Sequence, residues 1–84
     1  AQKNEMEPVL VELLPGASTS VDFPHDGEEF GYVLEGKIKI ELGKNVYVCK
    51  KGETFYYTAN KAHNIENVGK VTAKFLWIST PPNF

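Results

Sequence analysis

Cysteine is nearly absent from this chain of 84 residues, which contains only Cys49. A single thiol cannot form an internal disulfide, so we expect the fold to depend on packing rather than on covalent cross-links. A thiolate metal site is excluded for the same reason, and any bound metal would need imidazole and carboxylate ligands. Cys49 itself lies in an alternating run typical of a strand, where a small buried residue is expected. Such cysteine usage is typical of a cytoplasmic protein.

Long apolar runs and basic clusters are missing too. No stretch approaches the roughly 20 apolar residues of a membrane helix, and the N-terminus lacks a signal-peptide layout, so we expect no membrane association. The net charge is −2, and no run of Lys or Arg offers a stripe for a phosphate backbone. We therefore expect no nucleic acid to bind this segment itself. The first residue is Ala1 rather than Met, which suggests a processed protein or a fragment.

Helical periodicity is also absent, and short strands separated by turn residues take its place. The clearest strand is Lys37–Leu42, in which apolar and charged residues alternate. The pattern predicts eight strands, over Val9–Leu14, Thr19–Phe23, Glu29–Leu34, Lys37–Leu42, Val46–Lys50, Thr54–Thr58, His63–Asn67 and Thr72–Ser79. Short strands at about ten-residue spacing predict an all-β fold, a small antiparallel barrel or jelly roll. A chain of this length forms one core, so we expect a single domain over residues 1–84.

Only two histidines are present, and one of them lies four residues before a glutamate. On a straight strand, His25 and Glu29 would stand about 13 Å apart, too far for both to bind one ion at about 2.1 Å. Asp26-Gly27 favours a tight turn, which would let His25 end one strand and Glu29 begin the next on the same face. His63 would then arrive from a distant strand.

These residues resemble the first motif of the cupins, small jelly-roll barrels, which reads G-x5-H-x-H-x3-4-E-x6-G. His25 falls at the second histidine, and Glu29 and Gly36 fall in register after it. The first histidine position is occupied by Phe23. The chain therefore departs from the family pattern at one metal ligand.

The second cupin motif, G-x5-P-x-G-x2-H-x3-N, matches further along the chain. Gly52, His63 and Asn67 stand in register with it, while Thr58 and Asn60 replace its proline and glycine. Asparagine tolerates the left-handed conformation that a turn of this kind uses. The resemblance covers about two-thirds of the chain.

The resemblance implies three of the four cupin metal ligands, His25, Glu29 and His63, holding one divalent transition metal such as zinc, iron, manganese or nickel. Two histidines and one carboxylate form an iron-type arrangement with open positions. Phe23 would place an apolar ring where the fourth ligand is missing, which favours a drier pocket for a small organic molecule. Tyr57 is the remaining candidate for ligand binding, although aromatics of this kind commonly pack on strand faces. A hydrogen-bonded core cluster without metal is the alternative for the trio.

A narrower resemblance concerns the string His25–Gly36 and the ending Trp77–Phe84. Both are similar to the C-terminal half of XRE-type transcriptional regulators, which join a helix-turn-helix domain to a cupin. The resemblance implies a domain that senses a small-molecule effector and forms a homodimer, with DNA bound by an upstream domain. This is the leading interpretation.

Two other functions stay open at this point. A metal at the same three residues would suit a small stand-alone enzyme with an isomerase- or dioxygenase-like reaction. A purely structural dimerisation module is the third class. If Glu29 points inward, then Phe30, Tyr32 and Leu34 point outward and this apolar face needs a cover. The N-terminal strand, the Phe84 tail or a second subunit could supply it, and the exposed face favours a dimer.

Overall fold

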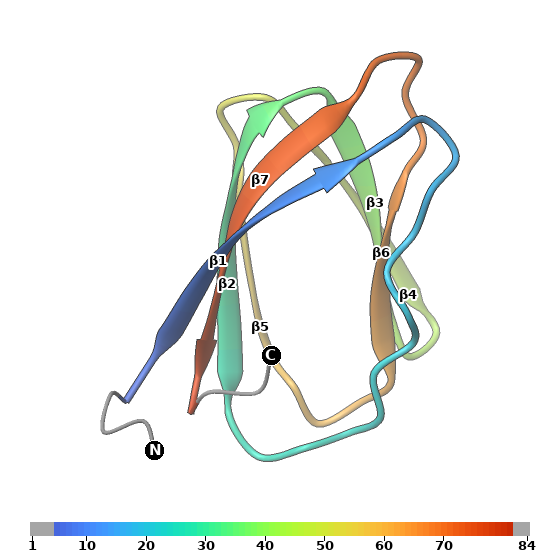
Figure 1. The fold of residues 1–84 in the computed structure, drawn as a ribbon. Helices are drawn as coiled ribbons and strands as arrows, with labels where there is room; N and C mark the ends of the chain where they lie inside the picture. Colours follow the sequence, from blue (N-terminus) through green and yellow to red (C-terminus); the bar gives the residue numbers. More distant parts are fainter. Residues whose placement is uncertain (1–4, 82–84) are drawn as a thin grey trace.

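The computed structural model describes residues 5–81, and strands are the only regular elements among them (Figure 1). The strands are β1 (Glu7–Leu13), β2 (Glu28–Glu35), β3 (Lys37–Leu42), β4 (Asn45–Lys50), β5 (Thr54–Thr58), β6 (His63–Asn67) and β7 (Ala73–Thr80). All paired strands are antiparallel. The predicted all-β jelly roll is thus confirmed. In the described residues there is no helix with the length and apolar character needed to cross a membrane.

Two sheets face each other across the core. One has the strand order β1-β7-β2-β5 and the other β4-β3-β6. Strand β7 alternates strictly, and its inward side chains include Phe75 and Trp77, while β3 and β6 supply Ile38, Ile40 and Ile65 from the opposite sheet. Full burial of one such side chain contributes about 1.5–3 kcal/mol to stability. The period-2 pattern of the sequence therefore marks the core correctly.

Strand β2 carries the predicted alternation. Gly31 and Val33 follow Glu29 into the interior, and the outward apolar residues are partly exposed: Phe30, Tyr32 and Leu34. A side chain at Gly31 would collide with the ring of Phe55, since an added Cβ would lie 2.0 Å from its Cζ. The missing side chain is what lets this ring pack flat inside the sandwich.

Asn67, the last residue of the second motif, has a structural role. Its buried amide donates hydrogen bonds to the carbonyl oxygens of Leu13 and Val71, at 2.9 and 2.8 Å. Its Oδ1 accepts one from the backbone N–H of Gly69 at 2.8 Å. The amide therefore ties the end of β6 to the end of β1 and to the loop that precedes β7.

The predicted strand at Thr19–Phe23 is wrong as a regular element. The structure has two isolated bridges there, Ser18 with Glu66 and Asp22 with His63. Ser18 and Asp22 are four positions apart, whereas their bridge partners Glu66 and His63 are three positions apart. An extra residue on one side breaks the ladder as a β-bulge does. Alternation alone does not reveal this insertion.

Candidate metal centre and adjoining cavity

The Asp26-Gly27 turn brings His25 beside Glu29, as the sequence predicts. Gly27 has φ +125°, and a Cβ there would lie 2.6 Å from the carbonyl oxygen of Thr80, so only glycine fits. Backbone hydrogen bonds to Ala59 hold both sides of the turn, at 2.8 and 2.9 Å. As a result, Nε2 of His25 lies 3.3 Å from Oε2 of Glu29.

His63 enters the same site from the first position of β6. Its pairing with Leu42 of β3 places the imidazole inside the sandwich, where it is almost completely buried. Nε2 of His63 lies 3.5 Å from Oε2 of Glu29. The ligand atoms of His25, Glu29 and His63 all lie within 4.8 Å of one another. The structure thus brings the three predicted metal ligands together.

Backbone carbonyl groups orient both imidazoles. Nδ1 of His25 lies 3.1 Å from the carbonyl oxygen of Asp26, and Nδ1 of His63 lies 2.8 Å from that of Lys61. A carbonyl oxygen only accepts, so the hydrogen-bond network assigns the proton to each Nδ1. In a neutral imidazole the lone pair is then on Nε2, which in both rings faces Glu29. Metal-binding histidines are held in the same way.

The carboxylate of Glu29 is fully buried and its two oxygens differ. Oε1 accepts hydrogen bonds from the Tyr57 hydroxyl at 2.6 Å and from Nε1 of Trp77 at 2.8 Å. Oε2 and Nε2 of His63 have no hydrogen-bond partner among the described residues. A buried polar atom left without a partner costs about 1–3 kcal/mol. A cation between them, a proton or a metal ion, would satisfy both.

The residues fit a metal ion on distance and on donor chemistry. Ligand atoms held tetrahedrally at about 2.1 Å from zinc stand about 3.4 Å apart. The distances from Glu29 Oε2 to the two histidine nitrogens are 3.3 and 3.5 Å. Imidazole and carboxylate ligands suit zinc, iron, manganese and nickel. The trio is therefore a candidate site for one divalent transition metal.

The sequence indicates a role in the site for Tyr57 but not for Trp77. Tyr57 was a candidate ligand-binding residue, and it contacts the carboxylate of the trio. Burial, and then its hydrogen bond to Glu29, raises the pKa of Tyr57 well above the ordinary value, so the phenol stays a proton donor. The role of Trp77 was missed, because it follows from the register of β7 against β2, which pairs Trp77 with Gly31.

Phe23 is 82% exposed, so its ring lies mostly in solvent rather than forming a dry wall beside the trio. Its role in ligand binding stays a prediction. The adjacent Asp22 is closer to the chemistry, because its Oδ2 lies 3.5 Å from Nε2 of His63. No motif or spacing in the sequence predicts this contact.

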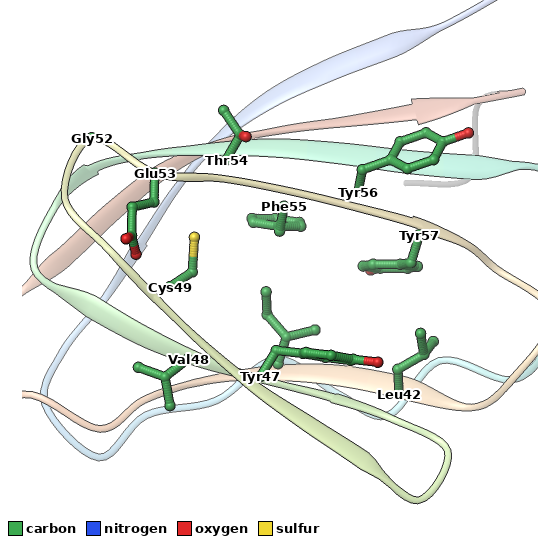
Figure 2. A pocket seen from close by; sticks show the side chains of 11 residues that line it. Leu42, Tyr47, Val48, Cys49, Gly52, Glu53, Thr54, Phe55, Tyr56 and Tyr57 are labelled. Carbon is green, nitrogen blue, oxygen red and sulfur yellow. The ribbon is translucent and has the colours of Figure 1, made fainter.

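A cavity of about 650 Å³ lies between the edge strands β4 and β5, and its lining includes Tyr57 but none of the three residues of the trio. Figure 2 shows the rings of Phe55 and Tyr57 on one side and Tyr47 and Leu42 on the other. Cys49 also lines the cavity, and burial, together with the charge of Glu53, raises the pKa of its thiol. Tyr57 belongs both to the cavity wall and to the carboxylate network. Tyr57 therefore connects the cavity wall to the carboxylate of the trio.

Comparison with curated proteins finds relatives that are longer than this chain. Protein MJ1618 of Methanocaldococcus jannaschii is 37% identical over 67 residues, which make up 80% of this chain and 54% of that protein. The HTH-type transcriptional regulator PuuR of Escherichia coli is 29% identical over 70 residues, 83% of this chain and 38% of the regulator. The chain thus spans about half or less of the length of these relatives.

Solved structures share the fold. The Cupin_2 domain of an XRE family transcriptional regulator from Enterobacter cloacae superposes with a TM-score of 0.82 at 18% identity, covering 94% of this chain and 84% of that one. A sugar phosphate isomerase of the cupin superfamily from Silicibacter pomeroyi gives 0.79 at 24% identity, covering 94% and 52%. The same barrel thus occurs in a regulator and in an enzyme. The cupin domain family Cupin_2 matches residues 9–79, and the chain belongs to this family.

Proposed function

We propose that the chain, as a single domain over residues 1–84, is the small-molecule effector-sensing and dimerisation domain of a cytoplasmic bacterial transcriptional regulator. DNA would be bound by a separate upstream domain. The similarity to PuuR and to the cupin domain of an XRE regulator supports this assignment. The low net charge of −2 agrees with a domain that leaves phosphate contacts to another part of the protein.

The observation that carries the proposal is the cavity that Tyr57 connects to the trio. Its volume of about 650 Å³ lies within the range of small-molecule pockets. Aromatic and aliphatic side chains line most of it, so we expect an effector with an apolar body. His25, Glu29 and His63 would hold the metal ion, which when bound supplies positive charge and open coordination positions for an oxygen or nitrogen atom of the effector.

Strand β5 offers a route from the cavity to the surface. Phe55 and Tyr57 face the cavity, while Tyr56 between them faces outward and donates a hydrogen bond to Glu28 of β2. An effector packed on the two inner rings would bias the position of this strand and hence of the outer face. An effector can shift an equilibrium only through such a difference in contacts between two states.

The outer face of the four-stranded sheet is apolar enough to support a homodimer. The strand register places two apolar rows side by side on it: Leu10, Leu76 and Tyr32 in one, and Pro8, Ile78, Phe30 and Tyr56 in the other. Leu10 is 65% exposed and Tyr56 63% exposed. Apolar patches of this kind on a soluble domain mark interaction sites. A two-fold interface would bury the same face of both subunits.

A thermal-shift screen tests the sensing part, using small carboxylates, amines and aromatic compounds with zinc present. We expect a subset to raise the melting temperature of the wild-type chain by several degrees. The variant Leu42→Trp, which fills the cavity, should lose this response, whereas Leu14→Trp at the exposed position after β1 should keep it. Circular dichroism checks that both fold. A response that survives Leu42→Trp would place the effector elsewhere.

Light scattering after size exclusion tests the dimer. We expect twice the 9.4 kDa chain mass for the wild type and the monomer mass for Phe30→Glu. Val46→Glu introduces the same charge on β4, away from the outer face, and should remain dimeric. A monomeric wild-type chain at high concentration would contradict the dimerisation role.

A metal-dependent enzyme, isomerase- or dioxygenase-like, is the second candidate. The observation in its favour is a carboxylate held by two donors so that its other oxygen faces two imidazoles, which leaves further positions of an ion open. Elemental analysis and turnover assays of the metal-loaded chain distinguish the two. Turnover lost in His63→Ala would favour the enzyme over the sensor.

A further inference from the structure

Asp22 is anchored to His63 by the backbone. The N–H of Asp22 donates to the carbonyl oxygen of His63 at 2.8 Å, and the N–H of His63 donates back at 3.0 Å. Partners in an antiparallel bridge direct their side chains to the same face. The carboxylate therefore follows the imidazole, and its Oδ2 lies 3.5 Å from Nε2 of His63.

The insertion between Ser18 and Asp22 decides which residue faces the trio. One extra residue relative to the segment from Glu66 to His63 changes the alternation along this stretch. Asp22 consequently shares a face with His63, and the neighbouring Phe23 is 82% exposed. Phe23 stands at the motif position of the missing histidine, but Asp22 is the residue whose side chain reaches His63.

Nε2 of His63 lies between two carboxylates at equal distance. Oε2 of Glu29 and Oδ2 of Asp22 are each 3.5 Å from it, and no hydrogen-bond donor of the described residues satisfies this nitrogen. Both separations match the edge of about 3.4 Å expected between ligands of one tetrahedral ion. Nε2 of His63 is therefore equally close to both carboxylates. Asp22 lies outside the group of ligand atoms within 4.8 Å of one another, so binding the same ion would require its part-exposed side chain to turn toward His25 and Glu29.

We infer that Asp22 supplies the fourth protein ligand of the metal centre, in place of the histidine missing at position 23. The inference rests on the metal site of the proposed function. Two carboxylates would balance the charge of a divalent ion, whereas Glu29 alone would leave one positive charge in a buried site, and buried net charge is costly. Asp22 is 38% exposed at its side chain, so it would close the solvent side of the centre.

Isothermal titration of the full chain with zinc, and with cobalt(II) as a visible-absorption probe, tests this inference. We expect Asp22→Asn to weaken zinc binding at least about tenfold, the lower end of what support of a metal site is worth. Glu28→Gln removes one charge near the trio at an exposed side chain and keeps the acceptor for Tyr56, so it should change the affinity less than about threefold. Asp22→His should restore most of the lost affinity, because it again offers a fourth donor.

The cobalt spectrum adds a readout that folding alone does not move. The intensity of its visible bands follows coordination number, so Asp22→Asn should change it and Glu28→Gln should not. Asp22→Ser repeats the test with a smaller side chain should the first variant fold poorly. Equal affinities for Asp22→Asn and Glu28→Gln overturn the assignment of Asp22, as does tighter binding by Phe23→His. Failure of the wild-type chain to bind any metal overturns the metal site itself.

Discussion

The hydroxyl of Tyr57 donates a 2.6 Å hydrogen bond to Oε1 of Glu29, the residue directly opposite it in the pairing of β2 with β5. Cross-strand partners of this kind are close enough to hold each other in place. Trp77 donates to the same oxygen from β7 on the other side of β2. The carboxylate is therefore fixed from both neighbouring strands, and its free oxygen faces the two histidines.

Removing the Tyr57 hydroxyl should weaken the metal site without removing a ligand. We expect Tyr57→Phe to lower zinc affinity about 10–100-fold, because partners that orient metal ligands contribute this much. Isothermal titration measures it. Tyr56→Phe is the matched control, since this phenol also donates to a glutamate, Glu28, but on the exposed face. Equal affinities for the two variants would show that the carboxylate needs no orientation.

Stability should fall in alkaline solution because of Tyr57. Burial, and then the hydrogen bond to Glu29, raises its pKa in the folded protein above the value of about 10 for an unfolded chain. The folded state thus holds this proton more tightly, so its contribution is complete below about pH 10 and decreases as the pH rises further. Urea unfolding of metal-free protein from about pH 8 to about pH 11 measures the free energy of unfolding.

The variant Tyr57→Phe isolates this effect from other groups. Cys49, through burial, and Tyr56, through its hydrogen bond to Glu28, also have raised pKa values and add to the same alkaline decline. We therefore expect the free energy of unfolding of Tyr57→Phe to decrease with rising pH less steeply than that of the wild type. An unchanged slope would mean that this phenol titrates alike in both states.

Gly31→Ala should destabilise the sandwich. The new methyl group would stand 2.0 Å from the ring of Phe55, and overpacking of a core costs about 1–3 kcal/mol. Displacement of the ring would also push it into the cavity that it lines. Gly69→Ala is the control, because a Cβ there meets its nearest neighbour at an ordinary 3.4 Å. Urea denaturation measures the free energy of unfolding of both variants. An equal decrease in the two would contradict the close packing of Gly31 against Phe55.

Cys49 should react slowly with thiol reagents in the folded protein. Burial, and secondarily the charge of Glu53, raises the pKa of its thiol, and the thiolate is the reacting form. Labelling with a chromogenic disulfide at about pH 8 should be at least about tenfold slower than in urea. Glu53→Gln keeps the acceptor for the Lys50 N–H but removes the charge, so it should speed the reaction. Reaction as fast as in urea would mean that the thiol is accessible.

Local patterns in the sequence predict a large part of this fold. Alternation along Lys37–Leu42 identifies β3, and the Asp26-Gly27 turn joins His25 to Glu29 without any long-range knowledge. Side chains alternate along a strand, so the inward position of Glu29 predicts the outward positions of Phe30, Tyr32 and Leu34. In each case the relevant residues lie within a few positions of one another.

Features that depend on register between distant segments were not predictable in this way. Trp77 reaches Glu29 only because β7 pairs with β2 at one register, 48 residues apart in sequence. Asp22 faces His63 because one residue is inserted before it, and a strictly alternating strand would favour other partners. A motif position marks where a side chain occurs in related chains, but bridging hydrogen bonds decide which face it occupies.

Strand β4 differs from the other strands in how it is held. Among the described residues it pairs with β3 alone, and Val46, Tyr47 and Val48 are each more than half exposed on both of its faces. Segments with few buried contacts open at the lowest free energy, so amide hydrogens of β4 should exchange before those of β7, which has a partner on each side. Because β4 forms one wall of the cavity, its local opening would admit the proposed effector while the central strands of both sheets stay intact.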